Sequence, residues 1–151
     1  MSAFRKILVP VDGSPTSRRG LKEAVRLAKD QGAKLRLVHV VDEQPVLSVM
    51  ETGVDVDDLC KSLVKSGHAL VERARREAQK QGVDAGTAIY ESVSGPPAEQ
   101  ILREARKWKA DLIVMGTHGR RGLRRVVMGS DAEQVVREAT VPVMLVRARR
   151  D

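Results

Sequence analysis

The stretch from Met115 to Asp131 combines residue types that suit phosphate binding. Residues 116–130 contain four glycines, four arginines and no acidic residue. Glycine lets the backbone approach a ligand closely and adopt φ angles that other residues avoid. An apolar run at residues 112–115 indicates a buried strand before the stretch, and Ser130 indicates a helix after it. A flexible cationic loop between a strand and a helix N-terminus predicts a phosphate-binding site.

The start of that helix also has an explanation that involves no ligand. Ser130 followed by Glu133 matches a capping box, in which the two side chains satisfy free amides of the first turn. For the serine alone, we favour capping over phosphate binding. Asp131 and Glu133 also place negative charge where a phosphate needs positive charge, so other groups have to compensate for them.

The arginines of the stretch are the obvious source of that compensation. We expect Arg120, which is nearest to Gly119, to contact the ligand. The arginines at positions 121, 124 and 125 either steer the ligand or face water, as most charge runs do.

Three other residues could do chemistry, and each has a structural explanation as well. His118 could hydrogen-bond phosphate or transfer a proton, but no carboxylate close in sequence orients it, so we predict no catalytic residue. Asp12 follows the first apolar run and could bind a metal beside a triphosphate, or it could begin the turn that caps the next helix. His39 lies inside an apolar run and is expected in the core or against a helix.

Composition predicts one domain, residues 1–151, with an aliphatic core. The chain has 151 residues, of which 42% are hydrophobic but only 2% aromatic, a composition that suits a parallel sheet covered by helices. The single cysteine, Cys60, has no disulfide partner and is expected to be a small helix residue. Since no segment resembles a signal peptide or a membrane span, we expect a cytoplasmic protein.

The charge balance favours anionic partners without choosing among them. Lys and Arg number 27 against 20 Asp and Glu, a formal net charge of +7. Nucleic acid is the least favoured of these partners, because the chain offers one Trp, one Tyr and one Phe for stacking on bases.

Strands and helices alternate along the chain. Short apolar runs predict strands at residues 5–11, 34–41, 85–93, 112–115 and 141–146. Each interval contains apolar residues at helical spacing, and Ser14 with Pro15 marks the start of the first helix. Because the strands are continuous apolar runs, we predict an α/β fold: a doubly wound, flavodoxin-like or Rossmann-like parallel sheet of five strands with helices on both faces.

In such a sheet, ligands bind beyond the carboxyl ends of the strands, where the strand order reverses. The loops after residues 10, 40, 94 and 116 therefore belong to the expected site. The chain has neither a P-loop motif nor a dinucleotide-binding motif of the form G-x-G-x-x-G after its first strand. It also shows no arrangement typical of a catalytic triad or a zinc site.

Four separated motifs, in the right order, resemble the universal stress protein family. They are Val-Asp-Gly-Ser at 11–14, Val-His-Val-Val-Asp at 38–42, Met-Gly-Thr-His-Gly at 115–119 and Val-Pro-Val-Met-Leu-Val at 141–146. The spacing of Gly116, Gly119, Gly129 and Ser130 is similar to the phosphate and ribose loop of the subgroup that binds ATP. The resemblance covers essentially the whole chain.

The resemblance implies an adenosine side and a phosphate side for the site. It assigns the adenosine side to the ends of the first two strands, with Asp12 as an acceptor for ribose or base, and the phosphate side to the glycine loop. The full set of candidate cofactor-binding residues is Pro10, Val11, Asp12, Val40, Met115, Gly116, His118, Gly119, Arg120, Gly129, Ser130, Asp131 and Val143.

We therefore expect an ATP-binding stress-response module with at most slow hydrolysis, and with Mg²⁺ or Mn²⁺ as candidate ions beside the triphosphate. Two alternatives stay open: a nucleotide-free dimerising interaction module of the same fold, and a slow ATP phosphohydrolase that uses His118. The resemblance also implies a homodimer through the last strand, which begins at Val141, since an apolar edge strand is usually covered or paired.

Overall fold

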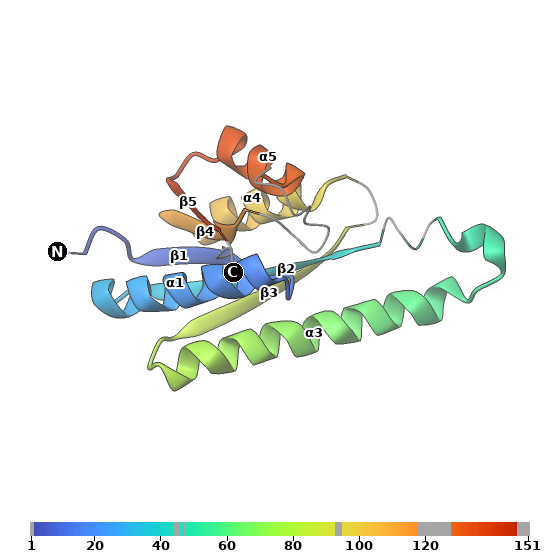
Figure 1. Cartoon of the computed structure of the whole chain (residues 1–151), viewed down its shortest axis with the longest axis horizontal. Coiled ribbons are helices and arrows are strands. Elements are labelled where there is room, and N and C mark those ends of the chain that lie inside the picture. The colour runs from blue at the N-terminus through green and yellow to red at the C-terminus, as the bar shows by residue number, and fades with distance from the viewer. Residues whose placement is uncertain (1, 44–45, 47, 93–94, 118–127, 148–151) are drawn as a thin grey trace.

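The computed structural model describes residues 2–43, 46, 48–92, 95–117 and 128–147. Helices and strands alternate along the chain, as expected (Figure 1). Their order is β1 (Lys6–Pro10), α1 (Pro15–Gln31), β2 (Lys34–Asp42), η1 (Met50–Thr52), α3 (Val56–Lys80), β3 (Ala85–Ser92), α4 (Pro97–Trp108), β4 (Leu112–Gly116), α5 (Ser130–Glu138) and β5 (Val143–Val146).

The strands among the described residues form one parallel sheet of five strands in the order β3-β2-β1-β4-β5. The predicted α/β class and doubly wound topology are therefore confirmed. The last strand was expected to begin at Val141, but β5 begins two residues later, at Val143. Pro142 has no N–H to donate to a sheet ladder, although its carbonyl still accepts from Ile113 N at 3.0 Å.

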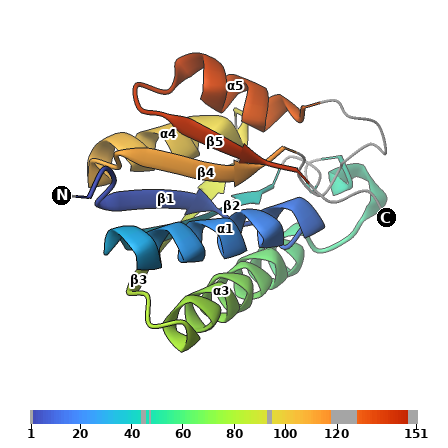
Figure 2. The same ribbon diagram turned by 60° about the vertical axis from the view of Figure 1, so that its left-hand side comes forward.

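Helices cover both faces of the sheet, α1 and α3 on one side and α4 and α5 on the other (Figure 2). Side chains alternate along each strand, so Ile7 and Val9 pack under α1 and α3, whereas Leu8 packs under α4 and α5. Because both faces of the sheet are apolar, each strand is a continuous run of hydrophobic residues in the sequence.

Helix α1 begins and ends as its sequence predicts. The Ser14 hydroxyl accepts a hydrogen bond from Ser17 N at 3.2 Å, and Pro15 occupies the first helical position. At the other end, Gly32 has φ 67°, in the left-handed region that favours glycine.

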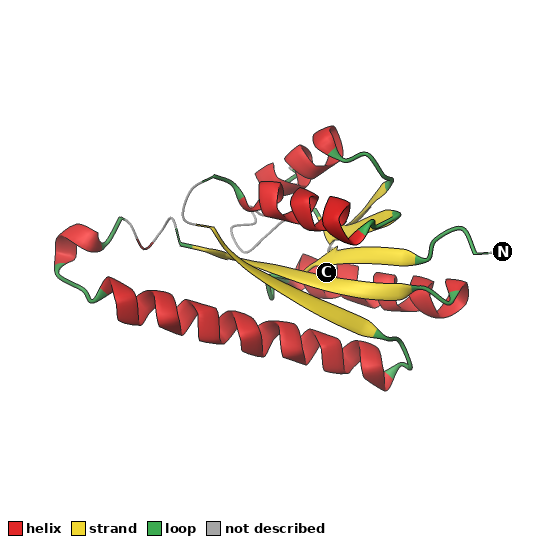
Figure 3. Ribbon diagram, turned by 180° about the vertical axis from the view of Figure 1, so that it is seen from behind, coloured by secondary structure: helices red, strands yellow, loops and turns green. Residues whose placement is uncertain are grey.

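Helix α3 extends well past the sheet at its N-terminal end, as Figures 1 and 3 show. Its buried residues, Gly67, Val71, Ala74 and Ala78, lie from its middle to its C-terminal end. Leu59, in the first half of the helix, is only half-buried. The free thiol Cys60 is half-buried there too. No helix in the described part of the chain is both long and apolar enough to cross a membrane.

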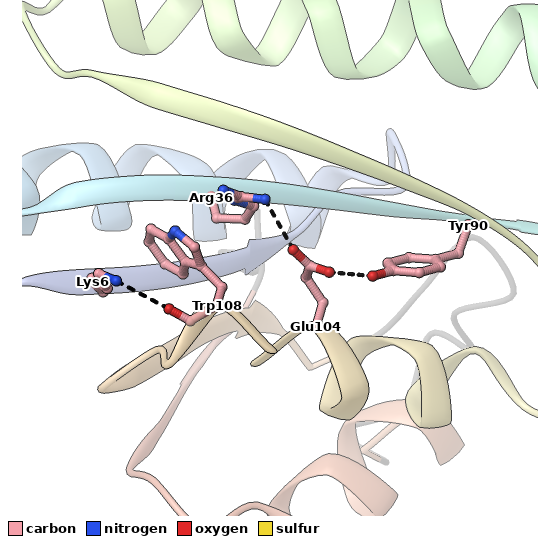
Figure 4. Close-up of polar contacts among 5 residues, drawn as sticks. All are labelled: Lys6, Arg36, Tyr90, Glu104 and Trp108. Carbon is pink, nitrogen blue, oxygen red and sulfur yellow. Dashed lines mark hydrogen bonds and ion pairs between the residues drawn. The ribbon is translucent and has the colours of Figure 1, made fainter. Parts of the chain in front are cut away.

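A buried carboxylate, Glu104 of α4, joins this helix to the sheet (Figure 4). It is 2% exposed, forms an ion pair with Arg36 of β2 at 3.1 Å and accepts a hydrogen bond from the Tyr90 hydroxyl of β3. The Arg36 guanidinium lies 5.2 Å from the centre of the Trp108 ring, and Lys6 Nζ donates to the Trp108 carbonyl at 3.2 Å. Burial raises the pKa of Tyr90, and the hydrogen bond to Glu104 raises it further.

Candidate functional site

The strand order reverses between β1 and β4. From β1 the chain continues to β2 and β3 on one side, and later to β4 and β5 on the other. All five residues of β1 pair with β2, whereas the ladder with β4 joins only Ile7 and Leu8 to their partners. The carboxyl ends of β1 and β4 therefore form the switch point at which doubly wound sheets bind ligands.

The loop after β1 is fixed by hydrogen bonds to its neighbours. Val11 N donates to the Val38 carbonyl at 2.8 Å, and Asp12 N donates to Ser17 Oγ at 3.1 Å. Asp12 Oδ1 accepts from Ser14 N at 2.8 Å, which forms the turn that leads into α1. The structural explanation of Asp12 is therefore confirmed, and hydrogen bonds tie the loop to β2 and α1 beside the switch point.

His39 supports this loop from the second strand. Its ring is 8% exposed, and Nδ1 lies 2.8 Å from the Val11 carbonyl. A carbonyl can only accept, so Nδ1 carries the proton. A Cβ added to Gly67 of α3 would lie 2.8 Å from His39 Cδ2, so the glycine makes room for the ring. The expected position of His39, against a helix, is confirmed. Its contact with Val11 was missed. The close approach of the ring to α3 has a sequence signal, because a glycine in the middle of a long helix marks such an approach.

Gly116, at the end of β4, has a different role from the one expected. It has no left-handed φ, and a Cβ added to it would lie 2.7 Å from both the Thr16 carbonyl carbon and Thr16 Oγ1. The missing side chain therefore allows α1 to pack closely on β4. This packing explains the glycine without a ligand.

Gly129 and Ser130 begin helix α5 beside the end of β4. Gly129 N donates to the Thr117 carbonyl at 2.6 Å. Gly129 is the N-cap, with φ −62° and ψ 154°, and among the described residues no side chain caps this helix. The expected left-handed φ at Gly129 and the expected capping box of Ser130 with Glu133 are therefore both wrong. Within the described ranges, the first amides of α5 have no side-chain cap, and Ser130, the first residue of the helix, is exposed.

Asp131 is turned toward a neighbouring helix. Its Oδ1 accepts a hydrogen bond from Ala98 N, in the first turn of α4, at 3.2 Å. A carboxylate at a helix N-terminus is favourable, so this charge is used to stabilise α4. The expectation that Asp131 opposes a phosphate at α5 overlooked this partner, which lies 33 positions earlier in the chain.

Most of the predicted apolar residues of the site lie on the face that α4 and α5 cover, whereas Val11 packs on the opposite face, under α1 and α3. Val40 is half-buried against this cluster, Met115 is 6% exposed within it, and alternation from Leu8 places Pro10 on the same face. Val143 pairs with Ile113, three rows before the end of β4, which is about 10 Å along the strand. The structure therefore brings Pro10, Val40 and Met115 to one edge, but not Val143.

His118, Gly119 and Arg120 lie outside the described residues. The same holds for the other arginines of the loop. Within the described ranges, no group of three or more His, Cys, Asp or Glu side chains could hold a metal ion.

Two cavities lined by described residues lie away from this edge. One, of about 490 Å³, lies between α1 and α3 and includes Leu21 and Lys80 in its lining. The other, of about 260 Å³, lies between α4 and the segment before β5. Neither contains a residue of the predicted site in its lining, so the candidate site is defined by the strand ends and the start of α5.

Comparison with known proteins agrees with the fold and with the sequence motifs. A family model described as the universal stress protein family matches residues 3–147. The chain is 37% identical over 150 residues to the universal stress protein YxiE of Bacillus subtilis, covering 95% of this chain and 99% of that protein. It is 36% identical over 144 residues to the universal stress protein MJ0531 of Methanocaldococcus jannaschii, covering 95% and 82%.

Solved structures share the fold over nearly the whole chain. The structure of MJ0577 from Methanocaldococcus jannaschii has a TM-score of 0.83 and 28% identity, covering 98% of this chain and 99% of that chain. Universal stress proteins solved in complex with cAMP and with dAMP have TM-scores of 0.69 and 0.64. Their identities of 23% and 20% bear on the fold alone.

Proposed function

Because the chain belongs to the universal stress protein family, we propose that it binds ATP at the switch point between β1 and β4 and acts as a nucleotide-dependent regulatory module. The observation that carries this proposal is the N-terminus of α5, which has no side-chain cap in the described part of the chain and is hydrogen-bonded to the residue that follows β4. The amides of a helix N-terminus and the positive end of the helix dipole attract phosphate.

The phosphate side of the site consists of groups that donate hydrogen bonds. Gly129 presents no side chain in front of the first amides of α5, and the exposed Ser130 hydroxyl is available to a phosphate oxygen. The acid next to them, Asp131, is hydrogen-bonded to α4, which reduces its repulsion of an anion. The likeness of the spacing at 116, 119 and 129 to that of the ATP-binding subgroup supports ATP as the phosphate compound, although packing on Thr16 is sufficient to explain Gly116 itself.

The adenosine side consists of the ends of β1 and β2. Pro10 and Val40 offer apolar surface for a base, and the loop that carries Asp12 is already held by hydrogen bonds. A ligand therefore pays little for ordering this loop. Asp12 remains the candidate acceptor for a ribose hydroxyl.

We expect at most slow hydrolysis. Amides and cations stabilise phosphate charge, but fast hydrolysis also needs a residue that positions the attacking water. A divalent ion, Mg²⁺ or Mn²⁺, would arrive with the nucleotide, because Mg²⁺ binds mainly through phosphate oxygens and water.

The test is titration calorimetry with ATP on purified protein from which carried-over nucleotide has been removed. We expect measurable affinity in the wild type and none in Gly129→Val, because the new side chain would stand in front of the amides. The φ and ψ of Gly129 suit valine, so this variant should melt at the wild-type temperature. A wild-type protein without ATP affinity would refute the proposal.

The second candidate is a nucleotide-free dimerising module. It is favoured by the edge position of β5 and by the exposure of Met144 on that strand. In that case Gly129→Val would leave partner association unchanged and the wild type would bind no ATP.

A further inference from the structure

Thr117, the residue after β4, carries a buried hydroxyl without a hydrogen-bond partner. The residue is 7% exposed, and its Oγ1 has no partner in the described structure. Buried polar groups in native proteins are rarely left in this state. The backbone of Thr117, in contrast, is fully used: its N–H donates to the Val146 carbonyl at 3.0 Å, and its carbonyl accepts from Gly129 N at 2.6 Å.

The position of Thr117 places this hydroxyl near the start of α5. Gly116 faces Thr16 of α1, so alternation along the strand turns Thr117 to the opposite face, with Met115 and helices α4 and α5. On that face, the hydrogen bond from Gly129 ties Thr117 to the N-cap of α5. A buried, unpartnered hydroxyl and an uncapped helix N-terminus thus occur at the same place.

Packing does not require a threonine here. Valine has nearly the same shape and would leave no unsatisfied polar atom, so a site that only needed to be filled would be better served by valine. The hydroxyl instead suits a ligand that brings its own acceptor. Phosphate oxygens are strong acceptors, and the amides of α5 attract phosphate to this position.

We propose that the Thr117 hydroxyl is a specific contact of the nucleotide site and donates a hydrogen bond to a phosphate oxygen at the N-terminus of α5. This inference rests on the proposed ATP binding. It adds a residue to the phosphate side that the glycine spacing does not point to.

The test compares wild type, Thr117→Val and Thr117→Ser, all freed of nucleotide. Titration calorimetry measures affinity for ATP and for adenosine, which lacks phosphate, and thermal melting measures the stability of the free protein. We expect Thr117→Val to melt at the wild-type temperature or above it, to bind ATP about tenfold more weakly and to bind adenosine as the wild type does. Thr117→Ser should bind ATP nearly as well as the wild type.

Wild-type ATP affinity in Thr117→Val would overturn this inference and leave the proposed function intact. An equal loss of affinity for ATP and adenosine would also overturn it, because the hydroxyl would then not act on phosphate. If the wild type bound no ATP, the proposed function itself would fail. Should Thr117→Val not fold, Thr117→Ala decides the question by the same two titrations.

Discussion

At the scale of single residues, a substitution of Ser130 distinguishes a structural role of its hydroxyl from a ligand-binding role. Its hydroxyl caps nothing in α5, so Ser130→Ala should leave the free energy of unfolding within about 0.5 kcal/mol of wild type, while ATP affinity should fall severalfold. Urea denaturation and calorimetry measure the two quantities. Ser14→Ala is the matched control, because the Ser14 hydroxyl does cap a helix and its loss should lower stability by about 1 kcal/mol. A similar loss of stability in Ser130→Ala would restore the capping box.

Tyr90 should make stability sensitive to alkaline pH. Burial, and then the hydrogen bond to Glu104, raise its pKa, so the folded protein holds this proton more tightly than the unfolded chain. The stabilisation is present below the ordinary tyrosine pKa of about 10 and is lost as pH rises through the folded-state value. We expect Tyr90→Phe to be less stable by about 1 kcal/mol at pH 7 and to lose less stability than wild type above pH 10. Denaturation at a series of pH values tests both; parallel pH curves would contradict the role of Tyr90.

Single residues also show where sequence reasoning ends. The cap at Ser14 involves neighbours within three positions, so the sequence predicts it correctly. Gly116 is explained by Thr16, and Asp131 by Ala98, both far away along the chain. A local sequence pattern gives no information about partners that lie far away along the chain. The structure therefore gives Gly116 and Asp131 packing and capping roles that the sequence does not predict.

At the scale of elements, the close contact between β2 and α3 depends on Gly67. Gly67→Ala should destabilise the protein by about 1–3 kcal/mol, because the new methyl group would overlap the His39 ring. The same change in a His39→Ala background should cost much less, because the ring is gone and only the Val41 side chain, 3.3 Å from the added Cβ, stays close, while alanine favours helix. Urea denaturation of the four proteins gives both values and their coupling.

The relief of most of this cost when the ring is removed is the decisive feature of this cycle. Ser66→Ala, at an exposed neighbouring position of α3, controls for helix propensity alone and should behave alike in both backgrounds. If the effects of Gly67→Ala and His39→Ala simply add, the ring and the glycine do not share the space that the structure indicates.

Element type and order follow from the sequence because apolar runs and helical spacing repeat over many residues. All five strands and their alternation with helices were predicted on this basis, and the parallel sheet confirms them. Register is not local in the same way. Val143 was expected beside the site, but its pairing with Ile113 places it toward the amino end of the sheet. The first half of α3 shows the same limit: helical spacing predicts a face, but not whether the sheet is long enough to cover it.

At the scale of the whole molecule, the open edge of β5 predicts a dimer of two copies of this chain. This edge carries Met144, 39% exposed, and the adjacent helix α5 carries Val136, 44% exposed. Pairing would cover both the unpaired backbone groups and this apolar surface. We therefore expect wild type to sediment as a dimer at micromolar concentration and to melt at a higher temperature as its concentration rises.

A lysine at the edge should prevent this association. Met144→Lys adds a charge that pairing would have to bury, and its exposed position keeps the core intact, so we expect a monomer whose melting temperature does not depend on concentration. Met50→Lys provides the matched control, because Met50 is 56% exposed on η1, in the connection between β2 and α3, and should leave the dimer unchanged. If both lysine variants were monomers, general charge repulsion rather than a change at the β5 edge would explain the loss of the dimer. A wild type that sediments as a monomer would exclude the dimer altogether but would leave the proposed ATP binding untouched, because the proposed site uses groups of one chain.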